Sequence, residues 1–343
     1  MGVRVPHPPP FFLTMRRNIM NVGILGCGTM GRLHAEMAEK CGLKVVQCSD
    51  VNSQSGKALA KSFKAKFVKN WEDVVANKDV DIVAIATPTP LHFPMLDLAI
   101  KKGKYIFCEK PLCRTVEECK KVIQKAEKAK IKLFVGHVVR YFHEFESIQE
   151  QIKSGKIGEV GFIKMYRGGM PPQGKNSWFC DFSKSGGVTF DCMIHDIDWL
   201  RYIFGEVKTV YCQNLIEKNC APLDYSQVTV RMKNGVLALV IGTWAHPSGF
   251  RVKVEVCGSD GLMYYDNMET PLEVQLREQN KVSGTIVPES PVIKSPYQKE
   301  WEDFISWIKD GKEPRVSMYD ALKAVEIVSA CLRSAKIKQP VNL

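Results

Sequence analysis

Residue types that suit hydride and proton transfer occur at two places in the chain. Lys110 lies in the segment Glu109-Lys110-Pro111, directly after an apolar run, and Asp191 and His195 are four positions apart. That spacing puts both side chains on one stripe of a helix, which Asp198 continues. Oxidation of an alcohol needs a group that takes the hydroxyl proton as hydride leaves carbon, and imidazole suits this at neutral pH. We therefore predict Lys110, Asp191 and His195 as catalytic residues.

Each assignment has a simpler structural alternative. A Glu-Lys pair is usually surface charge, and a His on a polar helix stripe is usually solvated. Two local features favour function: Pro111 stiffens the turn that presents Lys110, and Gly186-Gly187 permits close approach of the backbone to a ligand. A helix is predicted from Phe190 to Phe204, and its opposite stripe is apolar, with Met193, Ile197, Leu200 and Phe204.

A glycine-rich turn, Gly26-Cys27-Gly28-Thr29-Met30-Gly31, follows the first apolar run and opens a helix. The first glycine permits a tight turn, the second lets the backbone approach a pyrophosphate, and the third allows the helix to pack closely on the strand. Amides at the helix N-terminus then bind phosphate charge. We predict a dinucleotide site that includes Gly26, Gly28, Thr29 and Met30.

Asp50 lies at the end of the second apolar run, about twenty residues past the glycines. A carboxylate there accepts hydrogen bonds from the ribose hydroxyls and repels a 2′-phosphate, so NAD is predicted over NADP. The alternative is a cap on a helix from Asn52 to Phe63.

The loop from Thr87 to His92 follows the third apolar run, at the edge of the sheet where ligands of such folds collect. Thr87 and Thr89 are predicted to line the cofactor. His92 has two open interpretations, contact with the ribose or a structural role.

The first half of the chain alternates short apolar runs with amphipathic segments, which indicates a parallel sheet wrapped by helices, an α/β doubly wound fold. The runs are continuous, as expected for strands buried on both faces. Expected strands are Val22 to Leu25, Val45 to Cys48, Ile82 to Ala86, Tyr105 to Cys108 and Leu133 to Val135. Expected helices are Met30 to Ala38, Ser55 to Phe63, Pro90 to Lys101 and Val116 to Ala129.

After about Arg140 the pattern becomes that of an α+β domain. Strand-like segments join through turn signals such as Lys233-Asn234-Gly235, which favour antiparallel hairpins. Expected strands are Phe162 to Met165, Ser226 to Met232, Leu237 to Thr243 and Val252 to Cys257. One amphipathic helix is expected to follow Arg140 and end at Gln151, and two more are expected at Glu300 to Lys309 and Ala321 to Ser334. We predict a disordered extension (1–19), a dinucleotide domain (20–138) and a substrate and oligomerisation domain (139–343).

Composition narrows the function classes. The formal charge is +11, but the lysines are dispersed, so a solvated surface, or a field that steers an anionic ligand, is favoured over nucleic-acid binding. The 12 cysteines include no CxxC pair or zinc-like cluster, which predicts no metal and a reducing, cytoplasmic location. No apolar run reaches the roughly 18 residues of a membrane span.

Taken together, these motifs resemble the glucose-fructose oxidoreductase and inositol dehydrogenase family, Gfo/Idh/MocA, from Met20 to Leu343. The matching segments are Gly26 to Gly31, Thr87 to His92, Glu109-Lys110-Pro111, Gly186-Gly187 with Asp191-xxx-His195, Tyr297-xx-Glu300 and Asp320-Ala321-Leu322. The resemblance implies an N-terminal Rossmann domain and a C-terminal domain with a large, open, mostly antiparallel sheet that often mediates homo-oligomers.

The resemblance also implies roles for individual residues. Lys110 would bind and polarise the reacting oxygen, His195 would act as acid and base, and Asp191 would support it. Glu109 would approach the nicotinamide ribose, and Arg140 matches a position that often borders the substrate pocket.

The resemblance implies a dehydrogenase of a polyol or sugar, with inositol as the leading substrate. Another sugar, phosphorylated or nucleotide-linked, is an open alternative. Glycosidases of the family that use NAD transiently tend to lack the lysine, which is present here, and non-catalytic binding modules of this fold would not need both Lys110 and His195.

Overall fold

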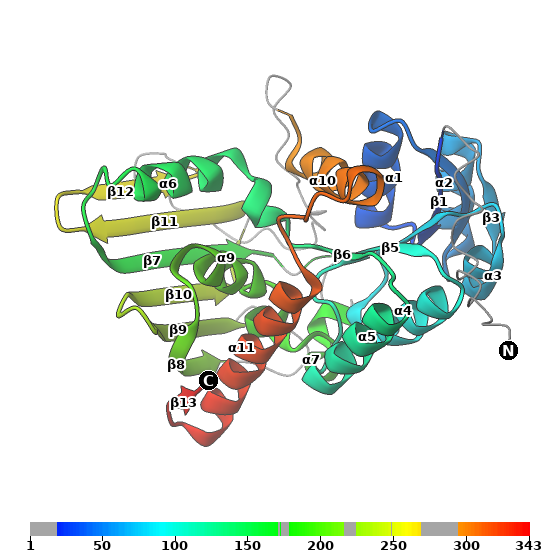
Figure 1. Ribbon diagram of the computed structural model, residues 1–343. Helices are drawn as coiled ribbons and strands as arrows, with labels where there is room; N and C mark the ends of the chain where they lie inside the picture. The colour runs from blue at the N-terminus through cyan, green and yellow to red at the C-terminus, as the bar shows by residue number, and fades with distance from the viewer. Residues whose placement is uncertain (1–18, 171, 173–177, 216–223, 248, 269–293) are drawn as a thin grey trace, which may run out of the picture.

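The computed structural model describes residues 19–343 except 171, 173–177, 216–223, 248 and 269–293. The predicted N-terminal extension lies outside the described residues, apart from Ile19. Two β-sheets lie side by side, with helices between them and around the first (Figure 1). No helix among the described residues is long and apolar enough to cross a membrane.

The first sheet is parallel, with strand order β3-β2-β1-β4-β5-β6. Its central strands are almost wholly apolar and buried, because helices cover both faces. The strands are β1 (Asn21–Leu25), β2 (Lys44–Ser49), β3 (Lys66–Val68), β4 (Ile82–Ile85), β5 (Tyr105–Glu109) and β6 (Leu133–Gly136). The helices are α1 (Thr29–Lys40), α2 (Ser53–Phe63), α3 (Trp71–Ala76), η2 (Thr89–Leu91), α4 (His92–Lys101) and α5 (Val116–Lys128).

The second sheet has the order β12-β11-β7-β10-β9-β8-β13. Neighbouring strands are antiparallel except β7 and β10, which are parallel. The strands are β7 (Val160–Gly169), β8 (Val207–Leu215), β9 (Tyr225–Met232), β10 (Leu237–Thr243), β11 (Phe250–Gly258), β12 (Leu262–Asp266) and β13 (Val341–Asn342). Burial alternates along β9, as expected for a sheet with one covered face.

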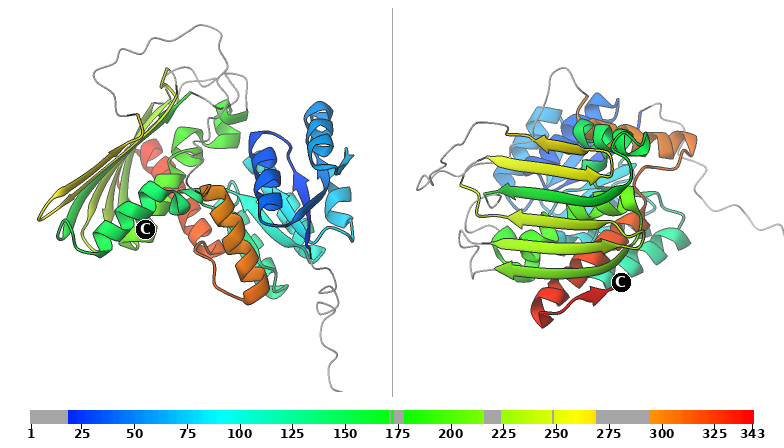
Figure 2. Two further views of the ribbon diagram at one scale, coloured as in Figure 1. Left: turned by 90° about the horizontal axis from the view of Figure 1, so that it is seen from above. Right: turned by 90° about the vertical axis from the view of Figure 1, so that its left-hand side faces the viewer.

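Helices cover one face of this sheet, and no helix of the described residues covers the other. In the right-hand view of Figure 2 the strands lie in front and the helices behind them. The helical elements of this half are η3 (Val138–Tyr141), α6 (His143–Lys153), η4 (Trp178–Cys180), α7 (Phe182–Ser185), α8 (Gly187–Asp191), α9 (Ile194–Phe204), α10 (Pro296–Asp310) and α11 (Met318–Ile337).

Helix α10 comes late in the chain but lies against α1 of the first sheet (Figure 1). Its buried residues Trp301 and Phe304 share one apolar cluster with Phe107 of β5 and Phe134 of β6. The Trp301 and Phe107 rings are stacked, with centroids 4.6 Å apart and planes at 8°. The C-terminal part of the sequence therefore completes the core of the N-terminal sheet.

The predicted fold class is confirmed: a parallel doubly wound sheet precedes a mostly antiparallel one. The continuous helix predicted from Phe190 to Phe204 is wrong. The chain forms α8 and α9 with an interruption at Cys192 and Met193, where both amides donate to the carbonyl oxygen of Val188. The elements β3, α3, η3, η4, α7, β8, β12 and β13 were not predicted.

Candidate active site

The glycine turn between β1 and α1 meets the steric demands of a dinucleotide site. Gly26 has a φ of +88°, and a Cβ atom there would lie 2.6 Å from the carbonyl oxygen of Ala86. At Gly31 a Cβ atom would lie 1.7 Å from the carbonyl oxygen of Gly26, so the helix packs directly on the turn. At Gly28, by contrast, a Cβ atom would meet no heavy atom of the described structure within 4 Å. The open space at Gly28 fits the close approach of a pyrophosphate.

Asp50 joins the end of β2 to the glycine turn. Its Oδ2 accepts a hydrogen bond from the Cys27 amide at 2.6 Å, and its Oδ1 accepts one from the Asn52 amide at 2.6 Å. The helix cap that could have explained Asp50 is made by Asn52, whose Oδ1 accepts from the amides of Gln54 and Ser55. Asp50 therefore lies beside the turn as an acceptor group, with lone pairs left for ribose hydroxyls.

His92 lies beneath the loops that end β4 and β5. It is 1% exposed, and its Nδ1 and Nε2 lie 2.9 Å from the carbonyl oxygens of Pro111 and Thr87. Burial lowers the pKa of His92, although hydrogen bonds to these carbonyls oppose the shift. Of the two interpretations, the structure favours the structural one, because the ring bridges two loops. Thr89 in the same loop is also buried.

Lys110 and Asp191 meet between the two halves of the chain. The Nζ atom of Lys110 donates to the carbonyl oxygen of Asp191 at 2.9 Å and lies 3.3 Å from its Oδ1. The two side chains are 15% and 7% exposed. Glu109, next to Lys110, accepts the Lys110 amide at 3.1 Å and lies 2.6 Å from Nε2 of His34. The end of β5 thus presents one ammonium and one carboxylate at the carboxyl edge of the sheet.

His195 lies at the start of α9 and is partly exposed, but its Nδ1 is buried and makes no hydrogen bond within the described structure. Burial, followed by the positive charges of Lys110 and Arg167, lowers the pKa of His195 well below its usual range. The imidazole is therefore neutral at pH 7 and can accept a proton. No hydrogen bond joins it to Asp191 in the part of the chain that the structure describes, so Asp191 holds Lys110 rather than the imidazole.

Two buried ion pairs fix α9 in place. Arg167 of β7 makes a bidentate contact with Asp196 at 2.8 and 2.7 Å, and Arg140 makes one with Asp198 at 2.8 and 2.6 Å. The guanidinium of Arg140 also contacts the carbonyl oxygen of Arg315. Its side chain is 1% exposed, which favours an anchoring role for Arg140 over the predicted place at the substrate pocket.

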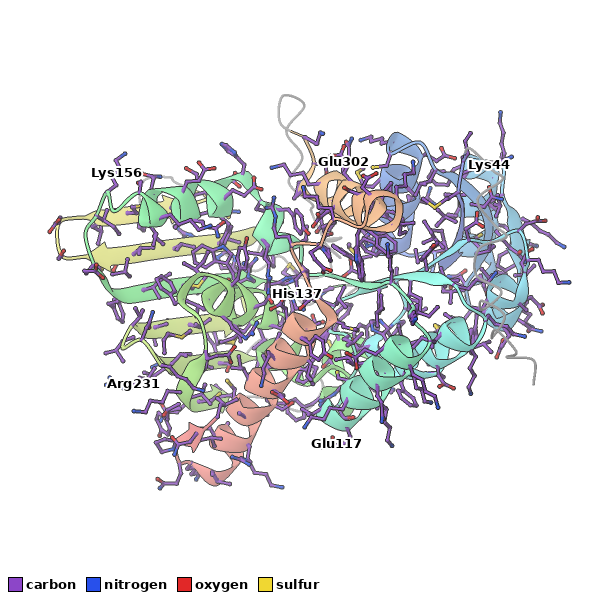
Figure 3. The ribbon with its side chains drawn as sticks, viewed as in Figure 1. Lys44, Glu117, His137, Lys156, Arg231 and Glu302 are labelled. Carbon is purple, nitrogen blue, oxygen red and sulfur yellow. The ribbon has the colours of Figure 1, made fainter. Side chains whose placement is uncertain are left out.

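Sequence reasoning missed several buried polar residues around this site. His137 follows β6 and lies in the middle of the molecule (Figure 3). Both of its ring nitrogens are buried and make no hydrogen bond among the described residues, although Nδ1 lies 3.7 Å from Oδ2 of Asp198. Arg167 and His34 were also missed. Arg167 alternates in phase with the buried residues Ile163 and Met165 of β7, which is a usable signal, whereas His34 on an amphipathic helix gave none.

The described residues contain no group of three or more His, Cys, Asp or Glu side chains that could hold a metal ion. The polar groups at the carboxyl edge, namely the open glycine turn, Asp50, the Lys110 and Asp191 pair, and His195, instead fit an organic dinucleotide and a polar substrate.

Comparison with known proteins assigns both halves of the chain. A family model described as an oxidoreductase family with an NAD-binding Rossmann fold matches residues 20–137, and the C-terminal alpha/beta domain of the same family matches residues 149–343.

Similar proteins extend over almost the whole chain. The chain is 28% identical over 335 residues to the myo-inositol 2-dehydrogenase of Thermotoga maritima, covering 94% of this chain and 98% of that protein. It is also 28% identical over 333 residues to the inositol 2-dehydrogenase of Rhizobium meliloti, covering 94% and 98%. The solved structure of myo-inositol 2-dehydrogenase from Lactobacillus plantarum superposes with a TM-score of 0.80 at 25% identity, covering 95% of this chain and 99% of that one.

Proposed function

The chain belongs to the Gfo/Idh/MocA oxidoreductase family, and from this premise we propose that it is an NAD-dependent dehydrogenase that oxidises a secondary alcohol of a polyol. Inositol is the leading substrate, because the similar proteins that span most of the chain are named for it. The observation that carries the proposal is the contact between Lys110 and Asp191 beside His195, at the edge of the sheet that bears the glycine turn.

Each side chain has a distinct part in this proposal. NAD, when bound, accepts the hydride. Lys110, held by Asp191, binds and polarises the substrate oxygen, because its ammonium is fixed where the two halves meet. His195 accepts the hydroxyl proton, and since its Nδ1 is buried, Nε2 is the nitrogen that meets the substrate. Glu109 lies on the nicotinamide side, at the end of β5.

We propose NAD rather than NADP as the cofactor. The space at Gly28 and the amides of Thr29 and Met30 would receive the pyrophosphate, and Asp50 would accept the ribose hydroxyls and repel a 2′-phosphate. Thr87 and Thr89 would line the nicotinamide half of the site. His92 would support that loop from below.

The test is a screen of inositols, aldoses and sugar phosphates for absorbance at the NADH band, with NADP in parallel. We expect NADH to accumulate with an inositol. Turnover with sugar phosphates alone would move the assignment to another sugar. Hydrolysis of a glycoside without net NADH, or binding of a sugar without any turnover, would contradict the dehydrogenase.

We propose that residues 20–138 bind the cofactor and residues 139–343 bind the substrate and form a homo-oligomer. The face of the second sheet that no described helix covers supports the oligomer: it carries exposed apolar side chains in three strands, Leu215 of β8, Tyr225 of β9, and Leu262 and Tyr264 of β12. Light scattering after size exclusion should give a dimer or tetramer. A cytoplasmic location is also proposed, since no described cysteine forms a disulfide.

A further inference from the structure

His34 of α1 connects the C-terminal helix α10 to Glu109. The ring is fully buried, and its two nitrogens have different partners. Nε2 lies 2.6 Å from Oε1 of Glu109, and the indole Nε1 of Trp301 donates to Nδ1 at 3.2 Å. An indole nitrogen can donate but cannot accept. Nδ1 is therefore the acceptor, and the proton on Nε2 points to Glu109.

This hydrogen bond defines the state of Glu109. Its Oε1 accepts from His34, and its Oε2 accepts from the Lys110 amide at 3.1 Å. Burial acts to raise the pKa of Glu109, but the hydrogen bond from His34 and nearby positive charge outweigh it, and the pKa is lowered. Two donors on two oxygens hold the group as an oriented carboxylate.

A second buried carboxyl nearby has the opposite character. Glu300 of α10 is fully buried, and neither of its oxygens has a partner among the described residues. Burial, followed by the negative charge of Glu109, raises the pKa of Glu300 well above its usual range. Of the two, Glu109 is the one whose carboxylate form is stabilised, because donors meet both of its oxygens and none meets those of Glu300.

Glu109 is also the carboxylate that reaches the cofactor side. Its side chain remains 11% exposed at the end of β5. Lys110 is paired with Asp191, so the charges of these two largely cancel, and the negative charge of Glu109 remains. An oxidised nicotinamide ring carries a positive charge that the reduced ring lacks.

We propose that His34 is a positioning residue that keeps Glu109 a fixed anion beside the nicotinamide, so that the site binds the oxidised cofactor more favourably relative to the reduced one. This rests on the proposed function, which puts the nicotinamide at the end of β5. Trp301 sets the donor direction of His34 and is itself fixed by its stacking on Phe107. The C-terminal helix thus takes part in cofactor preference without touching the cofactor.

Two substitutions of His34 separate its two hydrogen bonds. His34→Gln places an amide N–H near the position of Nε2 and keeps the donor to Glu109. His34→Asn is shorter: its side-chain oxygen can accept from Trp301 in the place of Nδ1, but no donor reaches Glu109. The full-length protein is titrated with NAD⁺ and with NADH by calorimetry, and the ratio of the two Kd values is compared.

We expect His34→Asn to raise the ratio of Kd for NAD⁺ to Kd for NADH by about tenfold. Without the donor of His34, burial favours the protonated form of Glu109, and loss of that charge near a charged ring removes an attraction of roughly this size. His34→Gln should keep the ratio of the unmodified protein. A ratio unchanged in His34→Asn overturns the proposal, and so does an equal weakening of both cofactors, which is the signature of a merely structural role.

Glu109→Gln provides an independent arm, since it removes the charge with little change of shape. It should raise the ratio of Kd for NAD⁺ to Kd for NADH as His34→Asn does. If His34→Asn does not fold, Glu109→Gln alone tests the proposal, and an unchanged ratio in this variant overturns it. Failure of the proposed function is distinguishable, because the unmodified protein would then oxidise no polyol. If only this inference fails, the unmodified protein still oxidises the polyol, and the ratio of the two Kd values does not change in the variants.

Discussion

Lys110 and Asp191 are 81 positions apart in the chain, and the ammonium of Lys110 contacts both the carbonyl oxygen and the carboxylate of Asp191. Lys110 directly follows strand β5 of the parallel sheet, and Asp191 ends the short helix α8. The contact therefore depends on how the two halves pack, and it fixes the orientation of the one cation that we assign to the substrate.

The first prediction concerns this pair and the neighbouring imidazole. Lys110→Ala and His195→Ala should each reduce kcat for the polyol by about 10² to 10⁴-fold, because a positioned acid or base contributes that much. NADH should still bind, as measured by its fluorescence. Lys102→Ala, at an exposed position, is the matched control and should keep normal turnover. Near-normal turnover in either active-site variant would refute the assignment.

The glycine turn offers a matched pair of substitutions. Gly28→Ala should change the stability by less than about 0.5 kcal/mol, since a Cβ atom there meets nothing in the described structure, but it should weaken NAD binding strongly. Gly31→Ala should destabilise the fold, because the Cβ atom would lie 1.7 Å from the carbonyl oxygen of Gly26. Thermal unfolding and calorimetric NAD titration of both variants test this. Unchanged NAD binding in Gly28→Ala would argue against a pyrophosphate at Gly28.

Removal of Asp198 should be costly for a different reason. Asp198→Ala leaves the guanidinium of Arg140, which is 1% exposed, without its bidentate partner, and we expect a loss of about 3 to 5 kcal/mol. Lys101→Ala is the control, because it breaks an exposed pair with Asp97 and should cost less than about 1 kcal/mol. Urea unfolding measures both. A similar loss of unfolding free energy in the two variants would contradict the larger contribution expected of the buried ion pair.

Glu300→Gln should have an effect that depends on pH. Because the pKa of Glu300 is raised on folding, the native state retains a proton that the unfolded chain releases above about pH 4.5. The native state therefore loses stability as pH rises, by about 1.4 kcal/mol per unit until the folded pKa is reached. The Gln variant lacks this loss, so its stability relative to the unmodified protein should rise from pH 5 to pH 8. A constant difference would show that Glu300 titrates normally.

The first sheet was predictable because its strands are continuous apolar runs. The five runs that were identified match β1, β2, β4, β5 and β6 within one or two residues at each end. The three-residue strand β3 was too short to give a pattern. Strand β8 was missed because the mixture of polar and apolar residues in Val207–Leu215 resembles the sequence of a surface loop. Burial nevertheless alternates along part of this strand.

The site was predictable where strand ends determine position. Asp50, Thr87 and Glu109 follow parallel strands, and the carboxyl ends of such strands meet at one edge. The contact between Lys110 and Asp191 could not be derived, since it arises from the packing of two halves. The burial of Asp196 and Asp198 was also not foreseen, because the arginines that pair with them, Arg167 and Arg140, come from other elements of the chain.

The position of α10 has a consequence for biosynthesis. The aromatic face of Phe107 and Phe134 is complete only when Trp301 and Phe304 arrive, some 160 residues after β6 leaves the ribosome. At translation rates of about 5 to 20 residues per second, the aromatic face of the nascent N-terminal sheet would remain uncovered for roughly 8 to 30 s. Chaperones that recognise exposed aromatic surface would find their target in this interval, and a truncated chain would keep it permanently.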